Sequence, residues 1–183
     1  MRLIAGEHRG RKIKQPSLDI ARPTKDRVRE AVFSMLASNV PASRVLDIFS
    51  GSGAYGLEAL SRGAASCTFI EKNPKCSGVL KENITLLGLE GVSSVITLDA
   101  EKVIKILGEE DRKFDLIFAD PPYKYNIIKK LLIMIYQYDI LNPTGALVIE
   151  HSAKEKLPDV EGDITIYKQK TYGNTSISVF LKK

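Results

Sequence analysis

The segment Asp120-Pro121-Pro122-Tyr123 has the residue types needed to hold an amine. Each proline fixes its φ angle at about −65° and lacks an N–H group, so the segment is stiff and presents acceptors instead of donors. The acceptors are the Asp120 carboxylate and the Pro121 carbonyl, and the Tyr123 ring adds a surface on which a flat heterocycle can stack. Such a turn can also serve only to end a strand, so its meaning depends on what lies beside it.

An exocyclic amino group on a nucleic-acid base fits this arrangement. Its lone pair is delocalised into the ring, which makes the nitrogen a poor nucleophile. Two acceptors that hold its two hydrogens favour a pyramidal nitrogen, whose lone pair can then attack a sulfonium methyl group in line. Stacking of an extruded base on Tyr123 adds roughly 1–3 kcal/mol. The turn alone leaves adenine, guanine and cytosine open.

A glycine-rich segment at residues 45–56 indicates a site for a nucleotide-like ligand. Gly51, Gly53 and Gly56 match the spacing GxGxxG between a predicted strand and a predicted helix, where glycine lets the backbone approach a ligand closely. Glu71 follows at the end of the next predicted strand, where a carboxylate can accept hydrogen bonds from ribose hydroxyls. The pattern alone also fits a dinucleotide site, or a tight turn that binds no ligand.

Asp47 favours S-adenosyl-L-methionine as the cofactor. Its carboxylate can face the ammonium group of the methionine portion, whereas it would repel a pyrophosphate. Too few residues follow the predicted sheet for the second catalytic domain that many dehydrogenases carry. We count Phe49, within the same segment, among the cofactor-binding candidates.

Asp99 and Ala100 follow the third predicted strand of the sheet. At the carboxyl edge of an open α/β sheet, the Asp99 side chain and the adjacent backbone N–H group could read the edge of an adenine ring. An aspartate before a helix is also a common N-cap, so the sequence leaves both interpretations open.

The excess positive charge of the chain lies in its first 30 residues. These residues hold nine Lys and Arg against four acids, whereas the other 153 residues hold 18 of each sign. A basic arm beside a balanced body favours RNA binding through phosphate contacts, although it could also only aid solubility. The RNA-binding candidates in this region are Arg9, Arg11, Lys12, Arg22 and Arg29.

Alternating short apolar runs and helical patterns predict a doubly wound α/β fold with a seven-stranded sheet. We expect parallel strands at 45–49, 67–70, 94–97, 114–119 and 146–149, and a closing antiparallel pair at 164–169 and 175–181. The helices are expected from Thr24 to just before Pro41 and at 55–62, 74–87, 100–107 and 126–138. Segments 2–5 and 10–14 could pair as an amino-terminal β-hairpin. We therefore expect one domain over 1–183, with an arm at 1–23 and a core at 24–183.

Composition excludes several other classes of protein. The chain has 183 residues, 44% of them hydrophobic and 27% charged, as in ordinary globular proteins. The start of the chain does not resemble a signal peptide, and its longest apolar run is too short to cross a bilayer. Two cysteines and two histidines give no zinc-ligand spacing, so we expect inert thiols and no metal. We expect a cytoplasmic protein.

Taken together, these motifs resemble the RsmD family of bacterial small-subunit ribosomal RNA guanine-N2 methyltransferases, and the resemblance covers nearly the whole chain. The amino-terminal block discriminates best, because several amino-methyltransferases share the Asp-Pro-Pro-Tyr turn. Ile48, Ser50 and Tyr55 depart mildly from the family pattern, and none of them removes a proposed functional group. The matching segments are 2–11, 22–24, 26–30, 46–53, 56–63, 120–123 and 172–175.

The resemblance implies a Rossmann-like class I methyltransferase fold with an amino-terminal β-hairpin. It implies 16S rRNA in an assembled or assembling small ribosomal subunit as the substrate, and we expect a monomer. It implies cofactor contacts at Asp47, Gly51, Gly53, Glu71, Asp99 and Ala100, and amine-holding residues at Asp120, Pro121 and Tyr123.

Three alternatives stay open on the sequence. A DNA adenine-N6 methyltransferase would share the turn and the glycine loop. A dehydrogenase would share the glycine loop alone. A noncatalytic RNA-binding or ribosome-assembly module would keep the sheet and the basic arm without turnover.

Overall fold

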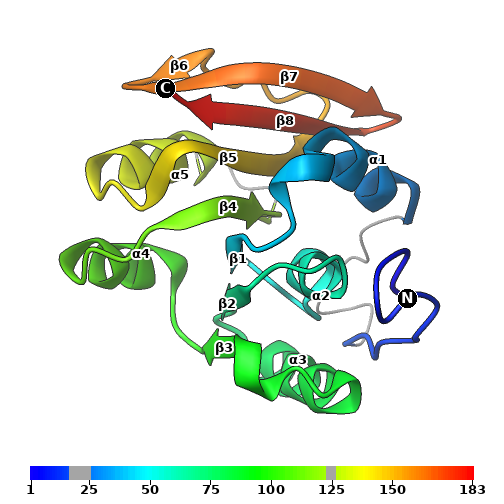
Figure 1. The fold of residues 1–183 in the computed structure, drawn as a ribbon. Coiled ribbons are helices and arrows are strands. Elements are labelled where there is room, and N and C mark those ends of the chain that lie inside the picture. The colour runs from blue at the N-terminus through cyan, green and yellow to red at the C-terminus, as the bar shows by residue number, and fades with distance from the viewer. Residues whose placement is uncertain (17–25, 123–126) are drawn as a thin grey trace.

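Helices cover both faces of one mixed β-sheet in the computed structural model, which describes residues 1–16, 26–122 and 127–183 (Figure 1). The strand order is β3-β2-β1-β4-β5-β8-β7-β6. Strands β1 to β5 run parallel, and β8, β7 and β6 continue the sheet in antiparallel fashion. The bounds are β1 (Arg44–Ile48), β2 (Ser66–Ile70), β3 (Ser93–Ile96), β4 (Phe114–Ala119), β5 (Leu141–Ser152), β6 (Val160–Glu161), β7 (Ile164–Tyr172) and β8 (Thr175–Lys182).

The predicted doubly wound arrangement and the antiparallel closing strands are confirmed, but the strand count of seven is wrong. The eighth strand, β6, has only two residues, which is too short to show an alternating pattern. Strand β5 is also longer than predicted. Its first residues include Pro143 and Gly145, which by sequence indicate a turn, and pairing with β8 carries it on to Ser152.

Among the described residues, three helices pack on one face of the sheet and two on the other. Val32, Leu57 and Leu80 of the first group share an apolar core, whereas Ile104 and Leu132 of the second belong to a separate core. The bounds are α1 (Asp26–Leu36), α2 (Ala54–Ser61) and α3 (Pro74–Leu87) on one face, and α4 (Ala100–Glu109) and α5 (Ile127–Gln137) on the other. Short 3₁₀ turns follow α1 (Ala37–Asn39) and α3 (Glu90–Val92).

The α3 helix matches its predicted bounds because both of its ends carry strong signals. The Asn73 side chain accepts hydrogen bonds from the N–H groups of Lys75 and Cys76, and Pro74 occupies the first helical position. At the other end Gly88 adopts a left-handed φ of 69°. Thr24, the proposed N-cap of α1, lies outside the described residues. Within the described ranges no helix is both long and apolar enough to cross a membrane.

The amino-terminal segments 2–5 and 10–14 pair around a turn as predicted, in an antiparallel arrangement with one β-bridge, between Arg2 and Lys12, flanked by further backbone hydrogen bonds. This pairing is short because the next backbone N–H groups along the chain bond to another part of the protein. Those of Ile4 and Ala5 donate to the buried carboxylate of Glu58 on α2, at 2.8 and 3.0 Å. The arm is therefore held both by its own short pairing and by the core.

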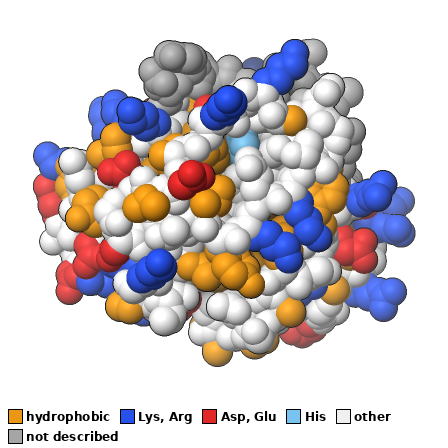
Figure 2. All heavy atoms as spheres, turned by 90° about the horizontal axis from the view of Figure 1, so that it is seen from above, with side chains coloured by type: hydrophobic (Ala, Val, Ile, Leu, Met, Phe, Trp, Pro, Cys, Tyr) orange, Lys and Arg blue, Asp and Glu red, His pale blue; other side chains and the backbone are white. Residues whose placement is uncertain are grey.

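The outer edge of the sheet carries a mixed set of side chains. Tyr167 on β7 is 66% exposed, and Lys168 and Lys170 on the same strand are also exposed. Figure 2, which views the molecule from this side, shows basic, acidic and apolar side chains interspersed. Lysines on an edge strand discourage pairing with a second sheet.

Candidate active site at the carboxyl edge of the sheet

The three glycines of the loop after β1 meet three different steric demands. Gly51 has a left-handed φ of 55°, and among the described atoms an added Cβ would meet nothing within 4 Å. Gly53 has a φ of 87°, and its Cβ would lie 2.5 Å from Leu80 Cδ1. At Gly56 the Cβ would lie 2.2 Å from the Phe69 ring. Gly51 therefore leaves room for a ligand, whereas Gly53 and Gly56 allow α2 to pack closely.

Two carboxylates hold this loop in place. Asp47 is buried and accepts a hydrogen bond from the Gly56 N–H group at 2.9 Å. Glu71 accepts from the N–H groups of Gly51, at 2.9 Å, and Asn73, at 2.7 Å. Burial raises the pKa of Asp47 to about 7, the Gly56 hydrogen bond opposes that rise, and the charge of Glu71 adds to it. A nearby cation would return Asp47 to its ionised form.

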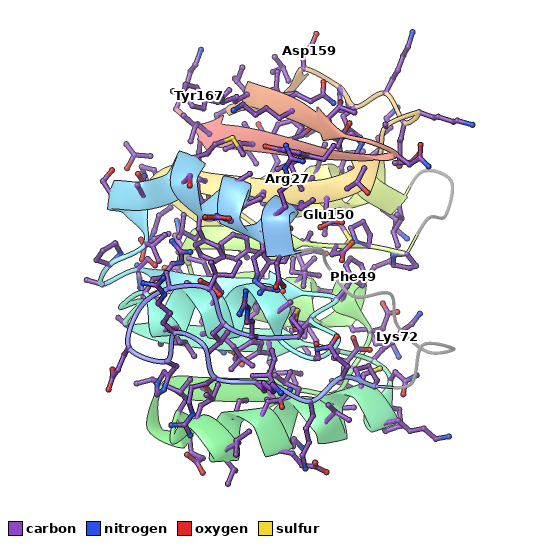
Figure 3. All side chains as sticks on the ribbon, turned by 90° about the vertical axis from the view of Figure 1, so that its right-hand side faces the viewer. Arg27, Phe49, Lys72, Glu150, Asp159 and Tyr167 are labelled. Carbon is purple, nitrogen blue, oxygen red and sulfur yellow. The ribbon has the colours of Figure 1, made fainter. Side chains whose placement is uncertain are left out.

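An open pocket lies beside the loop, along the ends of the strands. Phe49 and Lys72, which Figure 3 labels, line it together with Asp99, Ala100 and Pro122. Phe49 has a left-handed φ of 62°, a strained conformation for a residue with a side chain. The rest of the lining comes from α4 and α5 and is mostly apolar, namely Ile104, Ile127, Leu131 and Met134, with the ion pair of Glu101 and Lys130. A flat aromatic ligand fits such walls.

Asp99 caps α4 and also lines this pocket. Its Oδ1 accepts a hydrogen bond from the Glu101 N–H group at 3.1 Å, while the side chain stays exposed. Capping and ligand binding are therefore compatible here, because the second carboxylate oxygen is not used in that hydrogen bond. Ala100 is buried at the first position of the helix.

Asp120 directly follows β4, one residue beyond the last pair of the central ladders. Ala119 pairs with Ile48 of β1 on one side and with Ile149 of β5 on the other. The Asp120 N–H group donates to the Ile48 carbonyl at 3.4 Å, so the chain still follows β1 at this point. Pro121 is buried. Tyr123 lies outside the described residues.

Two side chains that the sequence analysis did not propose meet behind Asp120. The Tyr55 hydroxyl donates to Glu150 Oε2 at 2.8 Å, and both side chains are buried. The Tyr55 ring stacks on Phe118, with ring centroids 5.2 Å apart. Glu150 carries the signal that identified Glu71, an acid at the end of an apolar run, so the sequence could have indicated it.

The basic candidates of the amino-terminal region separate into two groups. Arg9, Arg11 and Lys12 are exposed on the arm, and the Arg11 guanidinium donates to the Leu86 carbonyl at 2.9 Å. Arg29, by contrast, is fully buried. Arg22 lies outside the described residues.

The prediction that Arg29 contacts RNA is contradicted by its burial. Its guanidinium donates to the Arg2 carbonyl at 2.5 Å and pairs with Asp26 at 3.2 Å and Glu58 at 3.5 Å. Glu58 also pairs with Arg62 at 2.8 Å. The charge of Arg29 thus balances a buried acid beneath the arm and is not presented to a phosphate on the surface.

The described residues hold no cluster of three or more His, Cys, Asp or Glu side chains that could bind a metal. Cys67 and Cys76 are both free and buried, as expected. Burial raises the pKa of the Cys67 thiol well above its ordinary value, so this thiol stays protonated.

Comparison with known proteins gives one concordant result across sequence and structure. The sequence model of a family described as "Conserved hypothetical protein 95" matches residues 1–181. The chain is 37% identical over 183 residues to "Putative rRNA methyltransferase YlbH" of Bacillus subtilis (strain 168), covering 100% of both. It is 31% identical to "Ribosomal RNA small subunit methyltransferase D" of Escherichia coli (strain K12), covering 100% of this chain and 90% of that protein.

The structure is similar to a solved structure titled "Putative methyltransferase yhhF from Escherichia coli". The TM-score is 0.90 at 31% sequence identity, and the match covers 100% of this chain and 98% of the other. A match of this quality confirms the predicted fold class.

Proposed function

We infer the function from one premise: this chain belongs to the RsmD family, whose sequence model carries the description "Conserved hypothetical protein 95". The resemblance noted in the sequence is confirmed. We propose that the chain is an rRNA methyltransferase that transfers a methyl group from S-adenosyl-L-methionine to the exocyclic N2 of a guanine in 16S rRNA. The names of the relatives support methyl transfer to rRNA, and guanine N2 is our more specific proposal.

One observation carries this proposal. The left-handed glycine loop and its carboxylates lie at the same sheet edge as the Asp120-Pro121 turn, because β1 and β4 are neighbours and end level with each other. A cofactor-type pocket and an acceptor for an amine are thus adjacent. Methyl transfer needs this adjacency, since the two reacting atoms must approach in line.

The cofactor would lie along the ends of β1, β2 and β3 and would supply the methyl group as a sulfonium. The ionised Asp47 would attract its ammonium group. Glu71 would exchange its loop contacts for ribose hydroxyls, and Asp99 with the Ala100 N–H group would read the adenine edge beside Phe49. The open space at Gly51 leaves room for the ligand beside the backbone. The close packing at Gly53 holds the loop against Leu80 of α3.

The acceptor end would be formed by Asp120, Pro121 and Tyr123. We propose that the Asp120 carboxylate and the Pro121 carbonyl hold the two amine hydrogens, while Tyr123 stacks on the extruded base. The acceptor nitrogen becomes acidic once methylated, so Asp120 need not be a strong base. Its function is to position the nitrogen and to stabilise the positive charge that forms there.

We propose that the exposed cations Arg9, Arg11 and Lys12, with Arg22, bind phosphates of the RNA. The arm (1–23) and the core (24–183) would act as one domain and as a monomer. A small-subunit substrate would place the protein in the bacterial cytoplasm, with the assembled or assembling subunit as its partner.

The decisive experiment is radiolabelled methyl transfer to small ribosomal subunits that lack the modification, followed by mapping of the methylated nucleotide. We expect one labelled guanine, with N2-methylguanosine after digestion. Label in duplex DNA and none in rRNA would favour a DNA adenine enzyme. RNA binding without any label would favour a noncatalytic assembly module.

A further inference from the structure

Glu150 is a buried carboxylate next to the acceptor turn, and the chemistry described so far does not use it. Ile149 is level with Ala119 in the parallel ladder, so Glu150 and Asp120 occupy equivalent positions on neighbouring chain segments. Neighbouring strands lie about 4.8 Å apart. Only 8% of the Glu150 surface is exposed.

The two carboxylates also lie on the same face of the sheet. Phe118 of β4 and Val148 of β5 both belong to the apolar core beneath α1, α2 and α3. Because alternate side chains share a face, Glu150 continues the face of Val148, and Asp120 follows the alternation of Phe118. Figure 3 shows Glu150 on this side of the sheet, below Arg27 of α1.

Tyr55 links Glu150 to the cofactor loop. It is the second residue of α2, between Gly53 and Gly56, and its hydroxyl donates to Glu150 Oε2 at 2.8 Å. Stacking on Phe118 fixes the ring two residues before Asp120. Burial raises the pKa of Tyr55 well above its ordinary value, as do the charges of Glu150 and Asp120, while Arg29 opposes the rise. The phenol therefore stays protonated, and it lies close enough to both carboxylates to interact with their charges.

We propose that Glu150 supplies a second negative charge to the methyl-acceptor subsite, and that Tyr55 is a positioning residue that orients it. This inference rests on the proposed function. As the nitrogen–methyl bond forms, the sulfur–methyl bond breaks and its electron pair stays on sulfur, so positive charge moves onto the acceptor nitrogen. The nitrogen then releases one proton to water. A fixed carboxylate beside it stabilises that charge without reorganisation.

A purely structural pair would join α2 to β5 and nothing more. Glu150→Gln separates the two interpretations, because the amide has nearly the same volume and its oxygen can still accept from Tyr55, but the charge is lost. A structural role predicts no effect of this substitution on chemistry. An electrostatic role predicts that kcat falls about 10- to 100-fold while KM for the cofactor stays within threefold.

A second readout needs no turnover. Sinefungin carries an ammonium group where S-adenosyl-L-methionine carries its reactive methyl, whereas S-adenosylhomocysteine has no charge there. The ratio of their Kd values, measured by calorimetry, reports the negative potential at the transfer point. We expect Glu150→Gln to reduce the preference for sinefungin about three- to tenfold, as a charge a few ångströms away would.

Two further variants complete the test. Tyr55→Phe keeps the stack and the charge of Glu150 but removes the orienting hydrogen bond, and we expect a several-fold lower kcat. Asp115→Asn is the matched control, since Asp115 lies near the opposite end of β4, where it accepts hydrogen bonds from the Arg44 N–H group and from Asn142. We expect it to leave both readouts unchanged.

An unchanged sinefungin preference in Glu150→Gln would overturn this proposal whatever the activity of the enzyme. A changed preference with kcat within twofold of the wild type would overturn the catalytic contribution. If Glu150→Gln does not fold, a normal kcat in Tyr55→Phe overturns the positioning role. The proposed function fails separately, if the wild-type protein does not methylate rRNA.

Discussion

The two halves of the sheet's carboxyl edge hold their carboxylates in different ways. In the half formed by β1, β2 and β3, Asp47, Glu71 and Asp99 each accept hydrogen bonds from backbone N–H groups, which belong to the glycine loop or to the first turn of a helix. In the half formed by β4 and β5, Glu150 accepts from Tyr55, a side chain 95 residues away along the chain. The carboxylates of the first half are therefore held by backbone donors, whereas Glu150 in the second half is held by a side chain that tertiary packing brings to it.

This difference has a functional consequence. A backbone-held site tolerates few substitutions, because each glycine and each acid stabilises one loop conformation. A side-chain-held site can be changed by single substitutions without disturbing that loop. We infer that single substitutions in the half near Asp120 and Glu150 change the preference for the methyl acceptor. Cofactor binding depends on the other half and is not changed by them.

The substitution Asp120→Ala is expected to have the largest effect, and it tests whether cofactor binding and acceptor binding belong to separate halves of the sheet edge. We expect turnover to fall by about a thousandfold or more, because the amine loses an acceptor and the charge that stabilises it. Cofactor affinity should stay within about tenfold, since Asp120 lies in the other half. Single-turnover methyl transfer and calorimetry with S-adenosylhomocysteine measure the two quantities. Near-normal turnover would contradict the mechanism, and a large loss of cofactor binding would contradict the separation.

Gly53→Ala tests the backbone-held half. The new Cβ would lie 2.5 Å from Leu80 Cδ1, at a residue whose φ is 87°. We expect at least a tenfold loss of cofactor affinity and a loss of stability of about 1–3 kcal/mol, because alanine resists a left-handed φ and the packed core resists expansion. Calorimetry and chemical denaturation measure these effects. Gly78→Ala in α3, where nothing lies within 4 Å of the added Cβ, is the control.

The same contrast explains what the sequence could predict. The glycine loop, Asp47 within β1, Glu71 after β2 and the bounds of α3 are encoded within a few residues, so local patterns identified them. The doubly wound sheet followed from alternating strand and helix patterns. A cap such as Asn73 acts on residues two and three positions away, and it therefore appears in the sequence.

Other features depend on contacts between distant segments, which no local pattern shows. The burial of Arg29 follows from Glu58 and from the arm that covers it. The predicted amino-terminal pairing is present, but it is short because Glu58 accepts hydrogen bonds from the N–H groups of Ile4 and Ala5. Tyr55 looked like a departure from the family pattern, and only the fold brings it to Glu150.

The pH dependence of stability tests the buried charge of Asp47. Because burial raises its folded-state pKa to about 7 from 3.8, the folded protein holds a proton that the unfolded chain has lost. The contribution of Asp47 is therefore fully present below about pH 4 and is lost as the pH rises to about 7. We expect a loss on the order of 4 kcal/mol at most.

Chemical denaturation at several pH values between 4 and 8 measures this loss, with Asp47→Asn as the comparison. The stability of the wild type relative to Asp47→Asn should decrease up to about pH 7 and then stay constant. Cofactor binding at pH 6 should also release protons, since the ammonium group favours the ionised acid. A constant difference across the range would show that Asp47 is ionised throughout.

Neutralising the exposed cations of the arm should have the smallest effect, and it tests whether the arm serves the acceptor half alone. We expect Arg9→Gln, Arg11→Gln and Lys12→Gln together to weaken RNA binding about tenfold at low salt. The slope of log K against log salt should become shallower by about 2 to 3, because up to three phosphate contacts are lost. Fluorescence anisotropy with an rRNA fragment over a salt series measures both.

The matched control removes the same charge from the helices on the other face of the sheet, with Lys102→Gln, Lys105→Gln and Lys129→Gln on α4 and α5. If only the arm variant changes the salt slope, the position of the charge matters and net charge does not. Equal changes in both variants would mean that RNA binding depends on the net charge of the whole protein. In either case cofactor affinity should change little, because Arg9, Arg11 and Lys12 do not line the pocket, and the contact between the arm and the glycine loop is made by Gln15 with Ser52. A changed cofactor affinity would show that the two halves are coupled through the arm.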